Sequence, residues 1–209
     1  MIKPFDKIPL KNKEKLIKNL RGYSVNIMKN EEIVDYFKDD DDMGIIISGR
    51  VDVVRTNYNG TTNIIEKFEA DDLINISYIY MDGSEYNLVA KEDTEILIIS
   101  YNTLINQESN DKIYNQFIKN LFAILNEIIT LRNERIVILT KKTIRDKLLE
   151  YFNISSRKSG SKYIYLPFNF SDLANYLGVD RSAMSRELGF LKEEGFISIK
   201  GKRITLLYR

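Results

Sequence analysis

The residues best suited to a specific chemistry stand close together near the C-terminal end of the chain. Two arginines and two serines are spaced three and four residues apart, so they share one face of a helix. Asp180 precedes them, where a carboxylate accepts hydrogen bonds from the first free N–H groups of a helix. Such a capped helix can donate to phosphates and to the edges of bases. The four residues are Arg181, Ser182, Ser185 and Arg186.

The preceding sequence predicts the element that positions these side chains. Residues 172–177 form a short predicted helix with Ser171 as its cap. Ala174 is small enough for a second helix to cross over it, and Gly178 allows the unusual backbone angles of a tight turn. The second helix is expected over residues 181–194. This spacing is typical of a helix–turn–helix, although a helical hairpin with no DNA role would share it.

A predicted β-hairpin follows, with strands over residues 196–200 and 203–207 around Gly201 and Lys202. A hairpin behind a helix–turn–helix is a wing, whose basic residues reach phosphates while the second helix enters the major groove. The candidate DNA-contacting residues are therefore Ser171, Arg181, Ser182, Ser185, Arg186, Lys200, Lys202 and Arg203.

Charge is divided unevenly along the chain, although the net charge is only +1. Residues 1–138 contain 17 Lys and Arg against 23 Asp and Glu, whereas residues 139–209 contain 14 against 7. The basic part coincides with the predicted helix–turn–helix and wing, which favours a polyanionic partner for that part alone. Chance asymmetry between two solvated surfaces is the alternative explanation.

Composition excludes several classes of site. The chain has no Cys and no His, so it offers no disulfide, zinc finger, thiolate cluster, thiol nucleophile or haem histidine. Paired acids such as Glu69 with Asp71 or Asp72 lie in a turn-rich stretch without a partner base, so we expect neither an enzyme nor a cofactor. The N-terminus lacks the apolar segment of a signal peptide, and no apolar run approaches a membrane span. We therefore expect a cytoplasmic protein without a membrane partner.

Short β-rich runs separated by turn signals fill residues 21–100, which predicts a β-sandwich or barrel-like roll. A single long helix follows over residues 111–137, roughly 40 Å in length. Apolar residues on it follow the a/d spacing of a coiled coil and predict a parallel homodimer. A helix buried against its own β-domain would need the same stripe. The β-runs are residues 34–37, 44–48, 51–55, 62–68, 86–90 and 95–100; the stripe is Phe117, Leu121, Ile124, Ile128 and Leu131.

The chain is thus expected to contain three parts: a β-roll over residues 1–110, a dimerisation helix over 111–138, and a winged helix-turn-helix over 139–209. A hinge is expected near residues 139–142, where the charge balance changes sign.

The run LPFNFSDLANYLGVDRSAMSRELGFLKEEGFISIKGKRITLL resembles the DNA-binding end of the CRP/FNR family, the regulators related to the cyclic-AMP receptor protein and the fumarate–nitrate regulator. The order of roll, long helix and winged helix extends the resemblance over nearly the whole chain. It implies an α+β fold with a jelly-roll-like double-stranded β-helix of the cyclic-nucleotide-binding kind. It also implies a homodimer that regulates transcription at a pseudo-palindromic operator in double-stranded DNA. An activator would further contact RNA polymerase, for which the loops at residues 39–42 and 56–61 are candidates.

In that family the recognition helix begins near the position of Arg181 and reads bases through its first two turns. Many members carry Glu where this chain has Ser182, and a carboxylate there would accept from cytosine, so the family's usual half-site is not expected. Glu187 stands where the family often has an aliphatic residue, and Leu188 can supply the packing. Arg186 is expected to donate to a guanine, with Arg181 divided between base and phosphate.

The residues argue against a cyclic nucleotide as effector. A buried phosphate requires an Arg fork, yet no Arg occurs between Arg55 and Arg132, and acidic residues crowd the corresponding stretch. An effector, where one exists, is expected to be uncharged or cationic and to bind near Tyr78, Tyr80, Tyr86 and Leu88, unless these residues are simply core. The alternative function is a small-molecule-sensing β-roll with weak or vestigial DNA binding.

Overall fold

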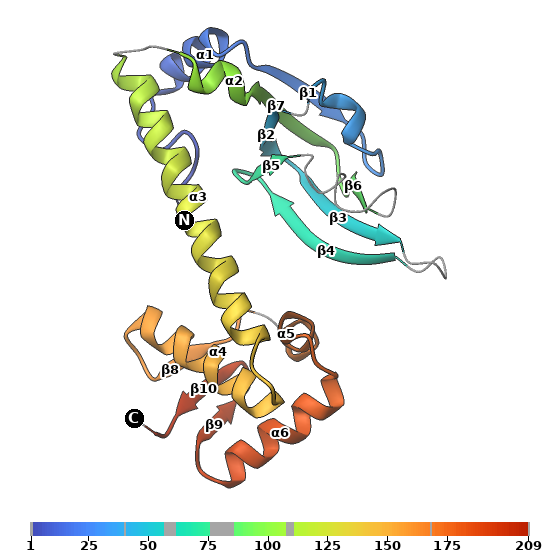
Figure 1. Ribbon diagram of the computed structural model, residues 1–209, viewed down its shortest axis with the longest axis vertical. Helices are drawn as coiled ribbons and strands as arrows, with labels where there is room; N and C mark the ends of the chain where they lie inside the picture. The colour runs from blue at the N-terminus through green and yellow to red at the C-terminus, as the bar shows by residue number, and fades with distance from the viewer. Residues whose placement is uncertain are drawn as a thin grey trace. The chain divides into compact units, whose positions relative to one another are not determined.

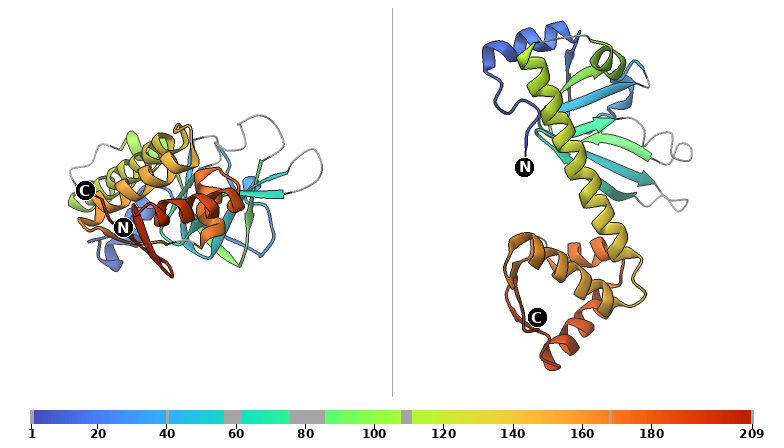
Figure 2. Two further views of the ribbon diagram at one scale, coloured as in Figure 1. Left: turned by 90° about the horizontal axis from the view of Figure 1, so that it is seen from below. Right: turned by 60° about the vertical axis from the view of Figure 1, so that its left-hand side comes forward.

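The computed structural model of the chain describes residues 2–39, 41–56, 62–75, 86–107, 111–167 and 169–208 (Figures 1 and 2). They form two compact units, the N-terminal unit Met1–Leu125 and the C-terminal unit Asn126–Arg209. The division falls within the long helix α3 (Lys112–Leu139) rather than at its ends. Phe117 packs into a core of the first unit and Ile138 into the core of the second, so each half of α3 belongs to a different unit.

Two antiparallel sheets build the N-terminal unit, with strand orders β1-β7-β2-β5 and β4-β3-β6. Helices α1 (Leu10–Asn19) and α2 (Tyr101–Ile105) pack beside the N-terminal half of α3 (Figure 1). The predicted α+β class and β-roll are confirmed. The strands are β1 (Tyr23–Ile27), β2 (Asp42–Ser48), β3 (Arg50–Thr56), β4 (Thr62–Glu69), β5 (Leu73–Asn75), β6 (Tyr86–Ala90) and β7 (Thr94–Ser100).

The strand predicted at residues 34–37 is wrong, because Val34–Tyr36 forms a turn of 3-10 helix, η1. The alternation of apolar and polar residues there looks like a strand. In the structure the turn instead brings Ile33 and Phe37 into one core, and the Ile33 N–H donates to the Leu88 carbonyl at 2.9 Å. A short turn with an apolar residue on each side buries both residues, so its sequence shows the same spacing of apolar residues as a strand with one buried face.

The two faces of the first sheet serve two different cores. Ile46 and Ile98 face the second sheet and pack with Leu88. Their neighbours Ile45 and Leu97 point to the other face, where they pack with α1 and α3. Because both faces are covered, strands β2 and β7 are continuous apolar runs instead of alternating ones.

The apolar stripe that predicted the dimer interface is largely buried by the N-terminal unit itself. The side chains of Phe117, Leu121 and Ile124 are only 0, 4 and 7 % exposed. Phe117 and Leu121 pack in the core shared with α1, and the ring of Phe5 stacks on that of Phe117 at 5.3 Å between centroids. These three side chains are thus buried within the chain itself, as the alternative of a helix packed on its own β-domain expects.

A second apolar stripe on α3 faces away from that core. Ile128 is half-buried and Leu131 is exposed, at the border between the two stripes. The second stripe follows the same three- and four-residue spacing, displaced by about one residue from the first. Its exposed members are Phe122, Leu125, Ile129 and Ile136.

The C-terminal unit contains the last part of α3, the helices α4, α5 and α6, and a sheet of order β8-β10-β9. One of these helices, α4, is absent from the sequence-based prediction. Thr143 caps it by accepting from the Asp146 N–H at 3.0 Å, and Phe152 anchors it in the core, where Phe152 is fully buried. The elements are α4 (Ile144–Ser159), β8 (Tyr163–Tyr165), α5 (Phe170–Leu177), α6 (Arg181–Glu193), β9 (Ile197–Lys200) and β10 (Arg203–Leu206).

Candidate nucleic-acid interface

The first helix of the predicted helix–turn–helix is capped by a residue other than the expected one. Asn169 accepts from the Asp172 N–H at 2.9 Å, and α5 begins at Phe170. Ser171 therefore lies inside the first turn, where it is half-buried, and the prediction of Ser171 as cap is wrong. Phe170 packs against the core of the unit. The helix therefore begins two residues earlier than predicted.

The turn and the second helix match the prediction. Gly178 has a left-handed φ of 61°, and Asp180 caps α6 by accepting from the Ala183 N–H at 2.8 Å. The hydroxyl of Ser182 donates to the same carboxylate oxygen at 2.5 Å. These hydrogen bonds, that from Ser182 first, hold the pKa of Asp180 below its usual range. The Ser182 hydroxyl therefore donates its proton within the helix cap, and only its oxygen is left for a further hydrogen bond.

The polar face of α6 lies opposite its buried face. Met184, Leu188 and Leu191 are buried in the core of the C-terminal unit. The predicted contact residues of this helix are all exposed, and Gly189 adds a position where a Cβ would meet no atom within 4 Å. Those exposed residues are Arg181, Ser182, Ser185 and Arg186.

The predicted wing is present as the β9–β10 hairpin, closed at Gly201 with a φ of 61°. Lys200 and Lys202 are exposed at its tip. Arg203 is half-buried, and its guanidinium lies 5.9 Å from the centre of the Tyr163 ring on β8. The structure thus brings the basic residues of the wing and those of α6 together in one compact unit.

An ion-pair cluster that sequence reasoning missed joins α4 to α6. Arg145 donates through Nε to Glu187 at 2.6 Å, and through its two terminal nitrogens to Glu194 at 2.8 and 2.7 Å. Glu187, which departs from the aliphatic residue usual in the resembled family, therefore has a specific partner. The partners are 42 and 49 residues apart in the sequence, so no local spacing indicates the cluster.

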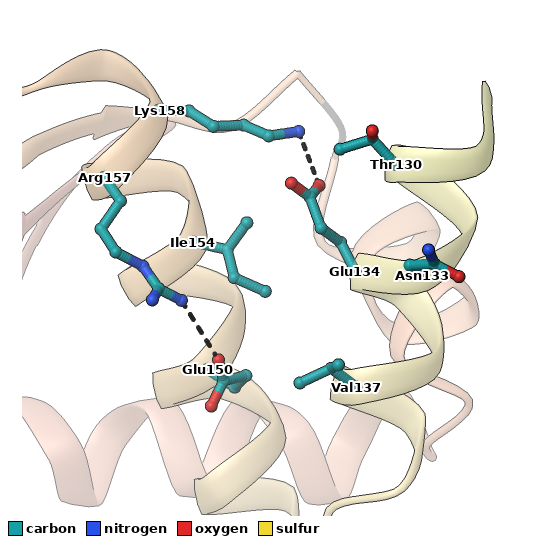
Figure 3. A pocket seen from close by; sticks show the side chains of 8 residues that line it. All are labelled: Thr130, Asn133, Glu134, Val137, Glu150, Ile154, Arg157 and Lys158. Carbon is teal, nitrogen blue, oxygen red and sulfur yellow. Dashed lines mark hydrogen bonds and ion pairs between the residues drawn. The ribbon is translucent and has the colours of Figure 1, made fainter. Parts of the chain in front are cut away.

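The last turns of α3 are fixed to α4 and α5. Ile138 is buried in the core, and the guanidinium of Arg135 lies 5.3 Å from the ring centre of Tyr176. A hollow of about 340 Å³ lies between α3 and α4. Val137 and Ile154 contribute its apolar lining (Figure 3). Its four charged residues are paired with each other: Lys158 with Glu134 at 2.6 Å, and Arg157 with Glu150 at 3.5 Å.

The predicted effector residues lie only partly within the described chain. Tyr78 and Tyr80 fall outside it. Leu88 is fully enclosed in the core between the two sheets, and Tyr86 packs against that core, with the guanidinium of Arg55 5.5 Å from its ring centre. For this described pair the alternative reading, that the residues are core, fits the packing.

In the two loops named for RNA polymerase, Asp39 and Thr56 are exposed, whereas the last two acids of the first loop are engaged within the unit. Asp42 is buried and accepts from the Lys38 and Asp39 N–H groups at 2.9 and 3.2 Å. Asp41 accepts from the Ser100 hydroxyl at 2.8 Å. Residues 40 and 57–61 lie outside the described residues. Among the residues that are described, no helix is long and apolar enough to cross a membrane.

Two family models match the chain: a Crp-like helix-turn-helix domain over residues 144–209 and a cyclic nucleotide-binding domain over residues 24–110. Electron transport regulator A of Shewanella oneidensis is 26 % identical over 189 residues, and the fumarate and nitrate reduction regulatory protein of Vibrio cholerae is 29 % identical over 189 residues. Each alignment covers 87 % of this chain and 73 % of the relative.

Solved structures show the same fold. CprK complexed with OCPA aligns with a TM-score of 0.62 at 18 % identity, covering 93 % of this chain and 92 % of CprK. A CooA mutant from Carboxydothermus hydrogenoformans aligns with a TM-score of 0.57 at 20 % identity, covering 93 % of this chain and 86 % of CooA. With a matching family model on each unit and these regulators as relatives, the chain belongs to the CRP/FNR family of DNA-binding transcription regulators.

Proposed function

We propose that the protein binds a two-fold symmetric operator as a homodimer, with α6 in the major groove, in the cytoplasm. The observation that carries this proposal is the geometry of α6. Asp180 caps the helix, its apolar face is buried, and two arginines are exposed on its polar side. A dimer then presents two such helices to half-sites about one helical turn apart. No catalytic step is assigned to the chain.

Base reading depends mainly on Arg186. Because the Ser182 hydroxyl donates to Asp180, only its oxygen remains to accept from a base. Arg186 is exposed and keeps its fork for the O6 and N7 atoms of a guanine. Arg181, in the first turn, divides between base and phosphate, while Lys200 and Lys202 of the wing contact phosphates.

We assign the dimer interface to the exposed stripe of α3 rather than to the predicted one. Phe122 is 69 % and Ile129 is 57 % exposed, which is unusual for large apolar side chains on a helix. Their a/d-like spacing with Leu125 and Ile136 suits a parallel two-stranded coiled coil.

The effector, where the protein uses one, is proposed not to be a cyclic nucleotide. The stretch that would hold a phosphate contains Glu69, Asp71 and Asp72 and no arginine. Burial of Asp72 raises its pKa above the usual range, which marks an environment already unfavourable to negative charge. The negative charge of a phosphate would be disfavoured in the same environment.

Selection of binding sites from a random duplex library tests the proposal, using the purified protein without added ligand at physiological salt. Enrichment of a two-fold symmetric motif is the expected result. Weak, salt-labile binding without a motif would contradict binding in the absence of an effector. Isothermal titration with cyclic AMP is expected to give no heat of binding.

A further inference from the structure

Arg145 of α4 is bonded to the recognition helix α6 and to its C-terminal cap residue. Its guanidinium donates three hydrogen bonds, one to Glu187 and a two-pronged pair to Glu194. The three distances are 2.6, 2.7 and 2.8 Å, and such short bonds are typical of pairs in which donor and acceptor are charged. Glu187 lies in α6 and Glu194 is the cap residue at its C-terminal end. The two carboxylates are seven residues apart, so they lie on the same side, about two turns from each other.

The position of Arg145 in α4 is unfavourable for a cation. It is the second residue of a helix that begins at Ile144, where the helix dipole is positive. A cation at that end is disfavoured, so the contacts with α6 must offset the cost of placing Arg145 there. The same helix also reaches α5, because Lys147 donates to the carbonyl of Leu177 at 3.1 Å. Helix α4 therefore holds both helices of the helix–turn–helix by cationic side chains.

One partner of Arg145 is next to an expected DNA-contacting residue of α6. Glu187 directly follows Arg186, the expected base reader, and is only partly exposed. Without a cation between them, Glu187 and Glu194 would be two uncompensated negative charges on α6 and its C-terminal cap. A guanidinium fork fixes direction as well as charge, whereas an ammonium group supplies charge alone.

We propose that Arg145 is a positioning residue for DNA readout, which holds α6 against α4 in the orientation that lets Arg186 reach a base. This inference rests on the proposed function. Arg145 touches no DNA itself and acts through Glu187 and Glu194. The discrimination between operator and random DNA therefore depends on a side chain outside the recognition helix.

The test compares the affinity of each variant for the selected operator and for a random duplex of equal length at one salt concentration. Arg145→Lys keeps the charge and removes the fork. It is expected to lose about tenfold in operator affinity with little change on random DNA, because specific contacts need a fixed geometry. Glu187→Gln with Glu194→Gln keeps Arg145 but removes its charged acceptors, and is expected to lower the operator-to-random ratio in the same way. Arg157→Lys, on the same helix and paired with Glu150, is the matched control and should leave the ratio unchanged.

Two results would overturn the proposal. Arg145→Lys with the parent's operator-to-random ratio would show that charge alone suffices. A Glu187→Gln and Glu194→Gln variant that binds both duplexes more tightly by the same factor would show that the carboxylates act only by repulsion. Thermal unfolding of each variant separates loss of folding from loss of readout. Failure of the parent protein to enrich any operator would be failure of the proposed function, and is seen before any variant is made.

Discussion

The N-terminal and C-terminal units differ in which parts of the structure their polar side chains connect. In the N-terminal unit these groups close loops next to apolar sheets: Asp42 accepts from two backbone N–H groups, and the Thr94 hydroxyl donates to the Glu92 carbonyl at 2.7 Å. In the C-terminal unit they join one helix to another, as Arg145 does with Glu187 and Glu194. The β-roll thus depends mainly on apolar packing, whereas the shape of the DNA-reading unit also depends on charge pairs near the surface.

The largest expected effect comes from truncating the apolar packing of the N-terminal unit. Phe117→Ala removes a fully buried ring and should lower the free energy of unfolding by about 3–5 kcal/mol. Urea unfolding of the dilute protein measures the change. Phe122→Ala, five residues further along α3 and 69 % exposed, is the control, with an expected change of roughly 0.5 kcal/mol or less in the monomer. Equal effects of the two substitutions would contradict the assignment of the buried and exposed stripes.

The exposed stripe should govern association instead. Ile129→Glu places a charge in the proposed coiled-coil seam and should weaken dimerisation by about 2 kcal/mol or more, roughly thirtyfold. Sedimentation equilibrium measures the dissociation constant. Ile105→Glu alters an apolar residue of α2 that is similarly exposed but lies off the seam, so the dimer should persist. A dimer unaffected by Ile129→Glu would place the interface elsewhere.

Some features of the molecule could be predicted from the sequence, and others could not. The helix–turn–helix and wing could be predicted because caps, turns and apolar periods are local signals, as at Asp180 and Gly201. The face of α3 could not, because Phe117 and Phe122 belong to two apolar stripes of the same spacing. Nothing in the sequence says which stripe meets the chain's own sheets. The partners of Arg145 could not be predicted either, because only the folded unit brings α4 and α6 together.

Within the C-terminal unit, replacing Arg186 should lower the affinity for the operator more than it lowers the stability of the fold. Arg186→Ala is expected to cost about 1–3 kcal/mol of operator binding, mostly at one base pair. Competition binding against operators with single substitutions measures this loss. Lys202→Ala on the wing is the comparison, with a uniform loss across sequences and a shallower salt dependence. An equal loss for Arg186→Ala on all duplexes would make Arg186 a phosphate contact only.

A smaller effect separates the two candidate caps of α5. Asn169→Ala removes the acceptor for the Asp172 N–H and should lower stability by about 1 kcal/mol. Ser171→Ala, inside the first turn, should change it by roughly 0.5 kcal/mol or less. Chemical denaturation of both variants gives the comparison. The reverse order would restore Ser171 as the cap.

The smallest effect concerns the pH dependence of one carboxylate in each unit. The pKa of Asp180 is lowered by hydrogen bonds from the Ser182 hydroxyl and the Ala183 N–H, whereas the pKa of Asp72 is raised, mainly by burial. Asp180 therefore contributes stability above its unfolded pKa, and that contribution is lost as the pH falls through its lowered folded pKa. Asp72 has the opposite sign, with a contribution present below its unfolded pKa and lost as the pH rises through its raised one.

Carbon-13 NMR titration of the side-chain carboxyls measures both groups in one sample. Asp180 should titrate below Asp72, and Ser182→Ala should move the pKa of Asp180 upward while leaving that of Asp72 in place. A Ser182→Ala variant with an unchanged Asp180 titration would mean that the hydroxyl does not donate to the cap. In that case the hydroxyl proton of Ser182 would be available to a base, and the readout at the second position of α6 would differ from the one proposed.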